Sequence, residues 1–222
     1  MKPTIIFLLL SVITLRTSAA NPFIEKQPID VYQLYADLAL QNKISFQAFK
    51  QAIEGYQKIE VKKPILTIID YSKPSSEERF YVIDMGNRQL LFASHVSHGQ
   101  NSGDNHTTSF SNEDGSLKSS LGFFLTEDTY IGKNGLSLIL NGLERGINHN
   151  AKSRLIVIHG ADYSNPKKIQ LFGGRLGRSL GCPALPVELA KPIIEAIKGG
   201  SLVYAYSKND NEEYLRKSSV LR

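Results

Sequence analysis

Apolar side chains recur at helical spacing in the part of the chain that precedes residue 64. One such stripe lies in residues 30–40, and a second follows Ser45, a residue type that commonly caps the N-terminus of a helix. The two stripes consist of Val31, Leu34, Tyr35 and Leu38, and then of Phe46, Phe49, Ile53 and Tyr56. They predict a helical hairpin, so we assign residues 21–63 to an N-terminal helical segment that packs on the core.

From Pro64 onward the period of the apolar positions changes to that of strands. The β-rich runs cover residues 65–70, 79–84, 89–96, 122–126, 136–140, 154–159 and 201–206. Met85-Gly86-Asn87-Arg88, between the second and third runs, predicts a hairpin. Because helical patterns rarely alternate with these runs, we expect a mainly β fold over residues 64–207, an antiparallel or mixed sheet with peripheral helices.

Three segments depart from the strand pattern. Residues 98–120 are polar and predict a long loop, a feature that in compact domains is often functional. Residues 186–198 predict a helix that ends at Gly199-Gly200 and is kinked or split at Pro192. Residues 208–222 are rich in charge and predict a C-terminal tail.

The first twenty residues have the pattern of a secretory signal peptide. Lys2 precedes an apolar run over residues 4–15, and the small residues Ser18-Ala19-Ala20 follow. That run is shorter than the ~20 residues that a membrane-spanning helix needs. We therefore expect residues 1–20 to be removed and the protein to be exported to the periplasm or cell envelope, without stable membrane insertion.

Composition indicates a folded domain of ordinary kind. Hydrophobic residues make up 41% of the 222 residues, beside 17 Gly and 9 Pro, so a core can form and the bias of collagen-like, coiled-coil or disordered chains is missing. The formal net charge is +5. This excess is too small to indicate binding of nucleic acid.

The single cysteine, Cys182, cannot form an intramolecular disulfide in the oxidising compartment that the signal implies. A free thiol there is open to oxidation, which favours either burial or a chemical role. Its neighbours favour the chemical role. His159 ends a β-rich run and is followed by Gly160, so it can serve as a base. Gly181 directly precedes the thiol and has no side chain, so the backbone N–H groups there can face an oxyanion.

A basic segment adjoins this thiol. Residues 163–187 contain no acidic residue but include Lys167, Lys168, Arg175 and Arg178. With an ordinary pKa of ~8.5 only ~3% of a thiol is ionised at pH 7, so a nearby base and a positive field are needed to form the thiolate. We therefore expect the pKa of Cys182 to lie well below ~8.5.

These residues resemble the signature of the murein L,D-transpeptidases, in which His-Gly is followed further along the chain by Ser/Thr-x-Gly-Cys. His159-Gly160 and Ser179-Leu180-Gly181-Cys182 match it in order and identity. Leu180 stands where the common form has His, and Ala184 where it has Arg or Asn. In both departures the sequence resembles a divergent branch of this family, whose motif ends in Gly-Cys-Pro-Ala. The resemblance covers residues 64–206.

The resemblance implies an L,D-transpeptidase-like fold, a β-sandwich or mixed sheet, and a cysteine acyl transferase without cofactor or metal. Cys182 would attack the L,D peptide bond of a tetrapeptide stem of peptidoglycan and pass the acyl group to an amine. His159 would act as base, oriented by the backbone carbonyl of Gly160. Amides at Gly181 and Cys182 would stabilise the oxyanion, and Ser179 would support the turn.

For substrate binding we expect three residues to contribute. His98, in the polar loop, would line the donor groove. Arg175 and Arg178 would attract the carboxylates of the stem peptides, which are the expected partners.

Other interpretations stay open at the level of sequence. Water as acceptor would make the protein an L,D-carboxypeptidase with the same catalytic pair. A cell-wall-binding module with an inactive site would share the signal peptide but would not need Cys182 and His159 together. A metal site of Cys182, His159 and His98 is disfavoured, because zinc ligands usually occur in closely spaced pairs and His95-x2-His98 is the only near match.

Overall fold

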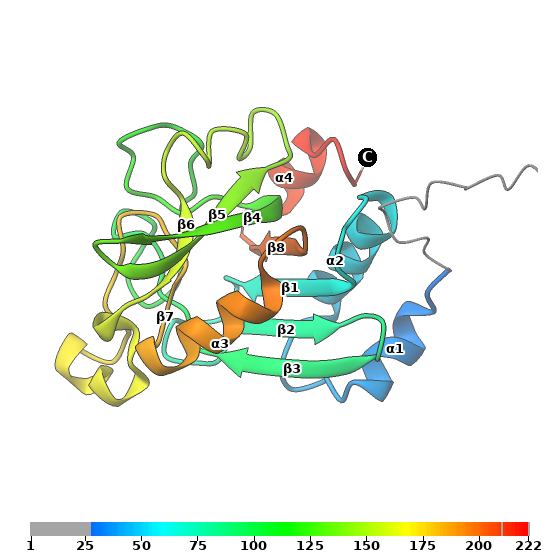
Figure 1. The fold of residues 1–222 in the computed structure, drawn as a ribbon, viewed down its shortest axis with the longest axis horizontal. Coiled ribbons are helices and arrows are strands. Elements are labelled where there is room, and N and C mark those ends of the chain that lie inside the picture. The colour runs from blue at the N-terminus through cyan, green and yellow to red at the C-terminus, as the bar shows by residue number, and fades with distance from the viewer. Residues whose placement is uncertain (1–27, 210, 222) are drawn as a thin grey trace, which may run out of the picture.

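The computed structural model describes residues 28–209 and 211–221. Within these ranges eight strands form one mixed sheet in the order β3-β2-β1-β8-β4-β5-β6-β7 (Figure 1). The strands are β1 (Ile65–Asp70), β2 (Phe80–Asp84), β3 (Gln89–Ser94), β4 (Gly122–Gly132), β5 (Gly135–Gly142), β6 (Val157–Gly160), β7 (Ala184–Leu185) and β8 (Leu202–Tyr206). The predicted mainly β fold with peripheral helices is confirmed.

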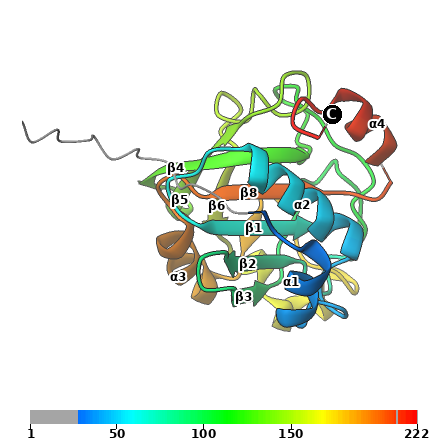
Figure 2. The same cartoon turned by 90° about the vertical axis from the view of Figure 1, so that its right-hand side faces the viewer.

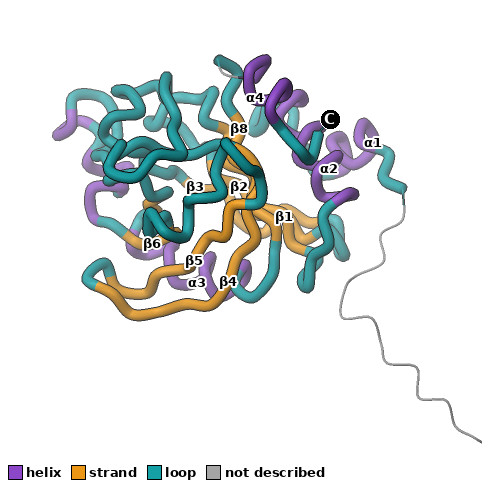
Figure 3. The backbone as a smooth tube through the Cα atoms, turned by 90° about the horizontal axis from the view of Figure 1, so that it is seen from above, coloured by secondary structure: helices purple, strands orange, loops and turns teal. Residues whose placement is uncertain are grey.

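The sheet curls until its two ends meet. Neighbouring strands are antiparallel except for β1 with β8 and β6 with β7. Just beyond β3, Ser97 forms a bridge with Ala184 of β7, and Ser97 N donates to Ala184 O at 2.8 Å. Because β3 and β7 are the first and last strands in the order, this bridge nearly closes the sheet into a barrel. Figure 3 shows the long loops gathered beside β3 and β6, away from α1 and α2.

Four α-helices of the described residues lie around the sheet. They are α1 (Val31–Asp37), α2 (Phe46–Lys58), α3 (Val187–Ile197) and α4 (Asn211–Lys217). Ser45 caps α2 as expected, its side chain accepting from Ala48 N at 3.2 Å. α2 packs on β1 and β8, and α3 packs on β6 and β5 (Figure 2). α3 continues through Pro192 as one helix, so the split that was one of our expectations is not seen.

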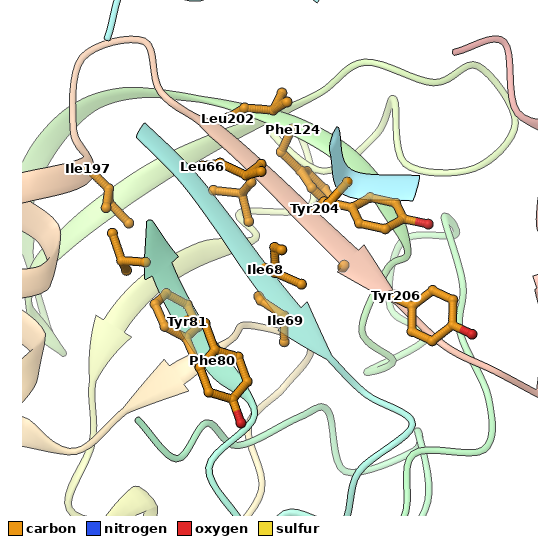
Figure 4. Close-up of a cluster of buried hydrophobic side chains, with 14 of the residues drawn as sticks. Leu66, Ile68, Ile69, Phe80, Tyr81, Phe124, Ile197, Leu202, Tyr204 and Tyr206 are labelled. Carbon is orange, nitrogen blue, oxygen red and sulfur yellow. The ribbon is translucent and has the colours of Figure 1, made fainter. Parts of the chain in front are cut away.

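The core lies on both sides of the middle strands. Every residue of β1 and of β8 is buried, which is typical of strands covered on two faces. Figure 4 shows the side chains of β1, β2, β4 and β8 that meet there. Tyr204 stacks on Phe123 with ring centroids 4.3 Å apart, and its hydroxyl donates to Gln51 of α2 at 2.6 Å. The N-terminal helices and the sheet therefore share one core.

Some elements differ from the sequence prediction. The hairpin of β4 and β5 is longer than the predicted runs and ends in Gly132-Lys133-Asn134-Gly135. The run predicted over residues 154–159 pairs as a strand only from Val157, because Leu155 has a φ of +56°, which strands do not adopt. β7 and the 3-10 turns Asp162–Ser164, Pro166–Lys168 and Gln170–Phe172 were not predicted. The segment predicted as a charged tail contains α4, whose Tyr214 is buried.

The expected signal peptide, residues 1–20, lies outside the described residues. In the described ranges, each helix is too short or too polar to cross a membrane.

Candidate functional site

β6 and β7 bring the two predicted catalytic side chains to one cavity. The strands are parallel neighbours, with His159 opposite Ala184, only two residues beyond Cys182. Both His159 and Cys182 line a cavity of about 600 Å³. Its walls also include the tip of the β4–β5 hairpin and residues of the polar loop.

His159 is held in one tautomer. Its Nδ1 lies 2.9 Å from Gly160 O, and because a carbonyl only accepts, Nδ1 carries the proton. Nε2 is then left with a lone pair that can accept a proton. The side chain is buried, which lowers the pKa of His159, although the hydrogen bond to Gly160 O opposes this shift. The imidazole is therefore neutral at pH 7 and suited to act as a base.

The Cys182 thiol lies between two backbone groups that precede His159. Val157 N donates to Sγ at 3.5 Å, and Sγ donates to Leu155 O at 3.4 Å. Burial raises the pKa of Cys182, while the Val157 amide and the Arg154 charge lower it. The expected low pKa is therefore wrong, because loss of hydration outweighs the positive field. The resting pair is a neutral thiol with a neutral imidazole.

A tight turn carries the thiol. Ser179 Oγ accepts from Gly181 N at 3.1 Å and donates to Cys182 O at 2.6 Å. Gly181 has a φ of +126°, and a Cβ there would lie 2.9 Å from Lys118 O, so only glycine fits. Since Gly181 N–H is bonded to Ser179, it does not point freely at an oxyanion as we expected. The Cys182 amide is the remaining candidate of the two.

The polar loop packs directly on this turn. Ser179 N donates to His98 O at 2.9 Å, and Gln100 N donates to Ser179 O at 2.8 Å. Ser119 Oγ donates to Gly181 O at 3.0 Å and accepts from Gly99 N at 3.0 Å. The loop therefore forms part of the framework of the site.

His98 does not line the cavity. Its side chain is completely buried, and Arg79 Nη2 donates to His98 Nδ1 at 2.7 Å. Burial, reinforced by the Arg79 charge, lowers the pKa of His98 to about 3. The expected contact with the donor groove is replaced by a structural role, because the cation of Arg79 needs a neutral acceptor in this position.

The basic segment is partly neutralised by Asp104, from the polar loop, and by Asp162, which directly precedes the segment. Arg175 Nε lies 2.6 Å and Arg178 Nη1 3.5 Å from Asp104 Oδ1, and Lys168 pairs with Asp162. Arg178 lines the cavity, whereas Arg175 is not among its lining residues. Of the two arginines that we expected to bind substrate, the structure thus brings one to Cys182.

The cavity also contains groups that the sequence did not single out. They are Arg154, Lys133, Asp114, Tyr130 and Tyr163. Three cations, counting Arg178, face one carboxylate, so the cavity suits an anionic ligand. The sequence pattern placed Arg154 in a strand, and only its hydrogen bonds to residues 111–120, far away in the sequence, place it here.

Within residues 28–209 and 211–221, no group of three or more His, Cys, Asp or Glu side chains is placed to hold a metal ion. Cys182, His159 and His98 accordingly do not form one ligand set.

A family model described as the L,D-transpeptidase catalytic domain matches residues 40–206. Among solved structures, an L,D-transpeptidase from Mycobacterium tuberculosis H37Rv is 14% identical with a TM-score of 0.41, over 64% of this chain and 57% of that one. An L,D-transpeptidase from Mycobacterium smegmatis is 13% identical with a TM-score of 0.39, over 64% and 58%. The chain thus spans less than two thirds of the length of these solved chains. A search of curated proteins finds no match.

Proposed function

The chain belongs to the L,D-transpeptidase catalytic domain family, and from this premise we propose that it is a cysteine acyl transferase of peptidoglycan that attacks the L,D peptide bond of a tetrapeptide stem. The observation that carries the proposal is the meeting of Cys182 and His159 in one cavity, with His159 Nδ1 fixed on Gly160 O. The acceptor is an amine, which makes the enzyme an L,D-transpeptidase.

The reaction begins from the neutral pair. When a stem peptide excludes water from the cavity, His159 Nε2 takes the thiol proton, and Cys182 Sγ attacks the carbonyl carbon before the terminal D-Ala. The Cys182 amide donates to the oxyanion of the tetrahedral intermediate. Collapse of this intermediate breaks the C–N bond. The imidazolium of His159 gives its proton to the leaving amine, so D-Ala departs and a thioester remains.

The second half reverses these roles. The amine of another stem attacks the thioester carbonyl, His159 accepts a proton from that amine, and the proton returns to the sulfur as the new amide forms. Turnover therefore needs one base and one nucleophile. The excess of cations around the cavity supports the choice of substrate, since stem peptides carry carboxylates.

The proposed role requires export, because peptidoglycan lies outside the cytoplasmic membrane. We propose that residues 1–20 are removed and that the mature protein acts in the periplasm or cell envelope.

Incubation of the mature protein with a disaccharide tetrapeptide, followed by mass spectrometry of the products, tests the proposal. Loss of D-Ala together with a crosslinked dimer is the expected result. Loss of D-Ala without a dimer would identify an L,D-carboxypeptidase. An unchanged tetrapeptide in the presence of folded protein would contradict an enzymatic function and favour a cell-wall-binding module.

A further inference from the structure

The guanidinium of Arg154 holds a large part of the polar loop. It lines the same cavity as Cys182 and makes four hydrogen bonds to residues 111–120. Nη1 donates to Ser111 O at 2.6 Å and to Ser120 Oγ at 2.7 Å, and Nη2 donates to Ser116 Oγ at 3.1 Å and to Lys118 O at 2.8 Å. All four bonds run to one segment, which is thereby fixed to the chain just before β6.

That segment is the part of the polar loop that supports the turn of residues 179–182, here called the thiol turn because it carries Cys182. Lys118 O lies so close to Gly181 that a Cβ would approach it to 2.9 Å, and Ser119 Oγ donates to Gly181 O at 3.0 Å. On its other side Arg154 is followed by Leu155, whose carbonyl accepts from Sγ. Arg154 is therefore linked to Cys182 in two ways. It bonds to the loop segment that contacts the thiol turn, and its neighbour Leu155 accepts from Sγ.

We propose that Arg154 is a positioning residue for Cys182, which clamps residues 111–120 against the thiol turn and supplies the positive charge that favours the thiolate when the proton leaves. This inference rests on the proposed function, because it assigns Arg154 a task in the reaction of Cys182.

The charges around the sulfur agree with this assignment. Besides Arg154, the charged and titratable groups of the cavity are Asp114, Tyr130, Lys133, His159, Tyr163 and Arg178. Of the three cations, Arg154 lowers the pKa of the thiol against the larger effect of burial. Burial lowers the pKa of Arg154 itself, with Asp114 and then Cys182 opposing the shift, and a guanidinium remains charged at neutral pH.

Alkylation of Cys182 by iodoacetamide between about pH 7 and pH 11.5 measures the thiolate without any peptidoglycan. Arg154→Lys keeps the charge but loses the planar fork, and Arg154→Gln loses both. We expect the midpoint of Arg154→Gln to rise by about one pH unit over that of Arg154→Lys, with alkylation at pH 7 slower by about tenfold. Lys152→Met is the matched control, since Lys152 pairs with Glu127 and does not line the cavity, and its midpoint should equal that of the wild type.

The clamp has its own test, which leaves the charge in place. The double variant Ser116→Ala, Ser120→Ala removes two of the four acceptors and should lower kcat for release of D-Ala severalfold. This variant tests the clamp even if the Arg154 variants do not fold. Equal midpoints for folded Arg154→Gln and Arg154→Lys would overturn the electrostatic role, and wild-type kcat in the double variant would overturn the clamp.

The two proposals fail in different ways. A wild-type protein that releases no D-Ala would remove the proposed function, whereas the alkylation midpoints would still show whether Arg154 acts on the thiol.

Discussion

His159 and Cys182 are both neutral at rest, because burial lowers the pKa of the imidazole and raises that of the thiol. The hydrogen bond to Gly160 O keeps Nε2 as the proton acceptor. The charged pair therefore forms only when the reaction begins.

This arrangement predicts a broad bell-shaped dependence of kcat/KM on pH. Protonation of His159 removes the base, so the acid limb should lie below the ordinary histidine value of ~6.5. Ionisation of Cys182 removes the proton that His159 would pass to the leaving amine, so the basic limb should lie above ~8.5. Rates of D-Ala release from pH 5 to pH 10 give both limbs. An acid limb at or above ~6.5 would contradict a neutral, buried His159.

His98 should make stability depend on pH. Its pKa is about 3 in the folded protein, where Arg79 donates to it, and ~6.5 when unfolded, so only the unfolded chain binds a proton between these values. The free energy of unfolding should therefore fall as pH drops below ~6.5, by up to about 1.4 kcal/mol per pH unit.

His98→Gln isolates this effect, because the amide oxygen can still accept from Arg79 and does not titrate. Thermal unfolding of both proteins between pH 7 and pH 5 should show a smaller loss of Tm in the variant. Parallel curves would refute the assignment of the titration to His98.

At the scale of elements, the thiol turn depends on the polar loop, residues 98–120, lying against it. His98 O, Gln100 N and Ser119 Oγ all bond to the turn. The composition of the loop indicated a functional segment, but it did not indicate these contacts. Each contact joins residues far apart in the sequence, whereas a periodic pattern describes only neighbouring residues.

Gly181→Ala should disturb this contact. The new Cβ would press on Lys118 O at 2.9 Å, in addition to the strain of a φ of +126°. We expect a loss of more than about 1 kcal/mol in the free energy of unfolding. Gly115→Ala is the control, since its φ is also positive, +69°, and nothing lies within 4 Å of its Cβ. Denaturant unfolding measures the loss in the free energy of unfolding for each variant. Equal losses in the two variants would show that backbone strain alone explains the result.

All the described strands except β7 followed from the apolar pattern, with ends misplaced where local backbone geometry intervened. Leu155 belongs to a β-rich run yet adopts a left-handed conformation, so β6 begins only at Val157. Arg79 stood at the edge of another run, where a charged residue suggests solvent. Instead it is completely buried, and its Nε and Nη2 donate to Val96 O at 3.1 and 2.8 Å. The hydrogen bonds that make burial of this cation possible depend on tertiary contacts, which produce no periodic pattern in the sequence.

At the scale of the molecule, closure of the sheet sets the charge of the cavity. It brings Arg178 into the cavity of Cys182 and leaves Arg175 outside that cavity, although both arginines lie near Asp104 and belong to one short basic segment. Sequence could show the excess of charge in that segment. It could not show that Asp104 would neutralise part of it.

The two arginines should therefore differ in substrate binding. Arg178→Gln should raise KM severalfold at low salt, and the difference from wild type should shrink as salt screens exposed charges over ~8–10 Å. Arg175→Gln, the matched variant outside the cavity, should change KM less. Steady-state kinetics at two salt concentrations test this prediction, which equal effects of the two variants would refute.

The most direct test of the catalytic role of Cys182 is the intact mass of the protein after rapid mixing with a disaccharide tetrapeptide and acid quench. We predict an adduct whose mass equals the stem without its terminal D-Ala, located on Cys182 by peptide mapping and missing in Cys182→Ala. Release of D-Ala by Cys182→Ala at the wild-type rate, or an adduct on another residue, would contradict the assignment of Cys182 as the nucleophile.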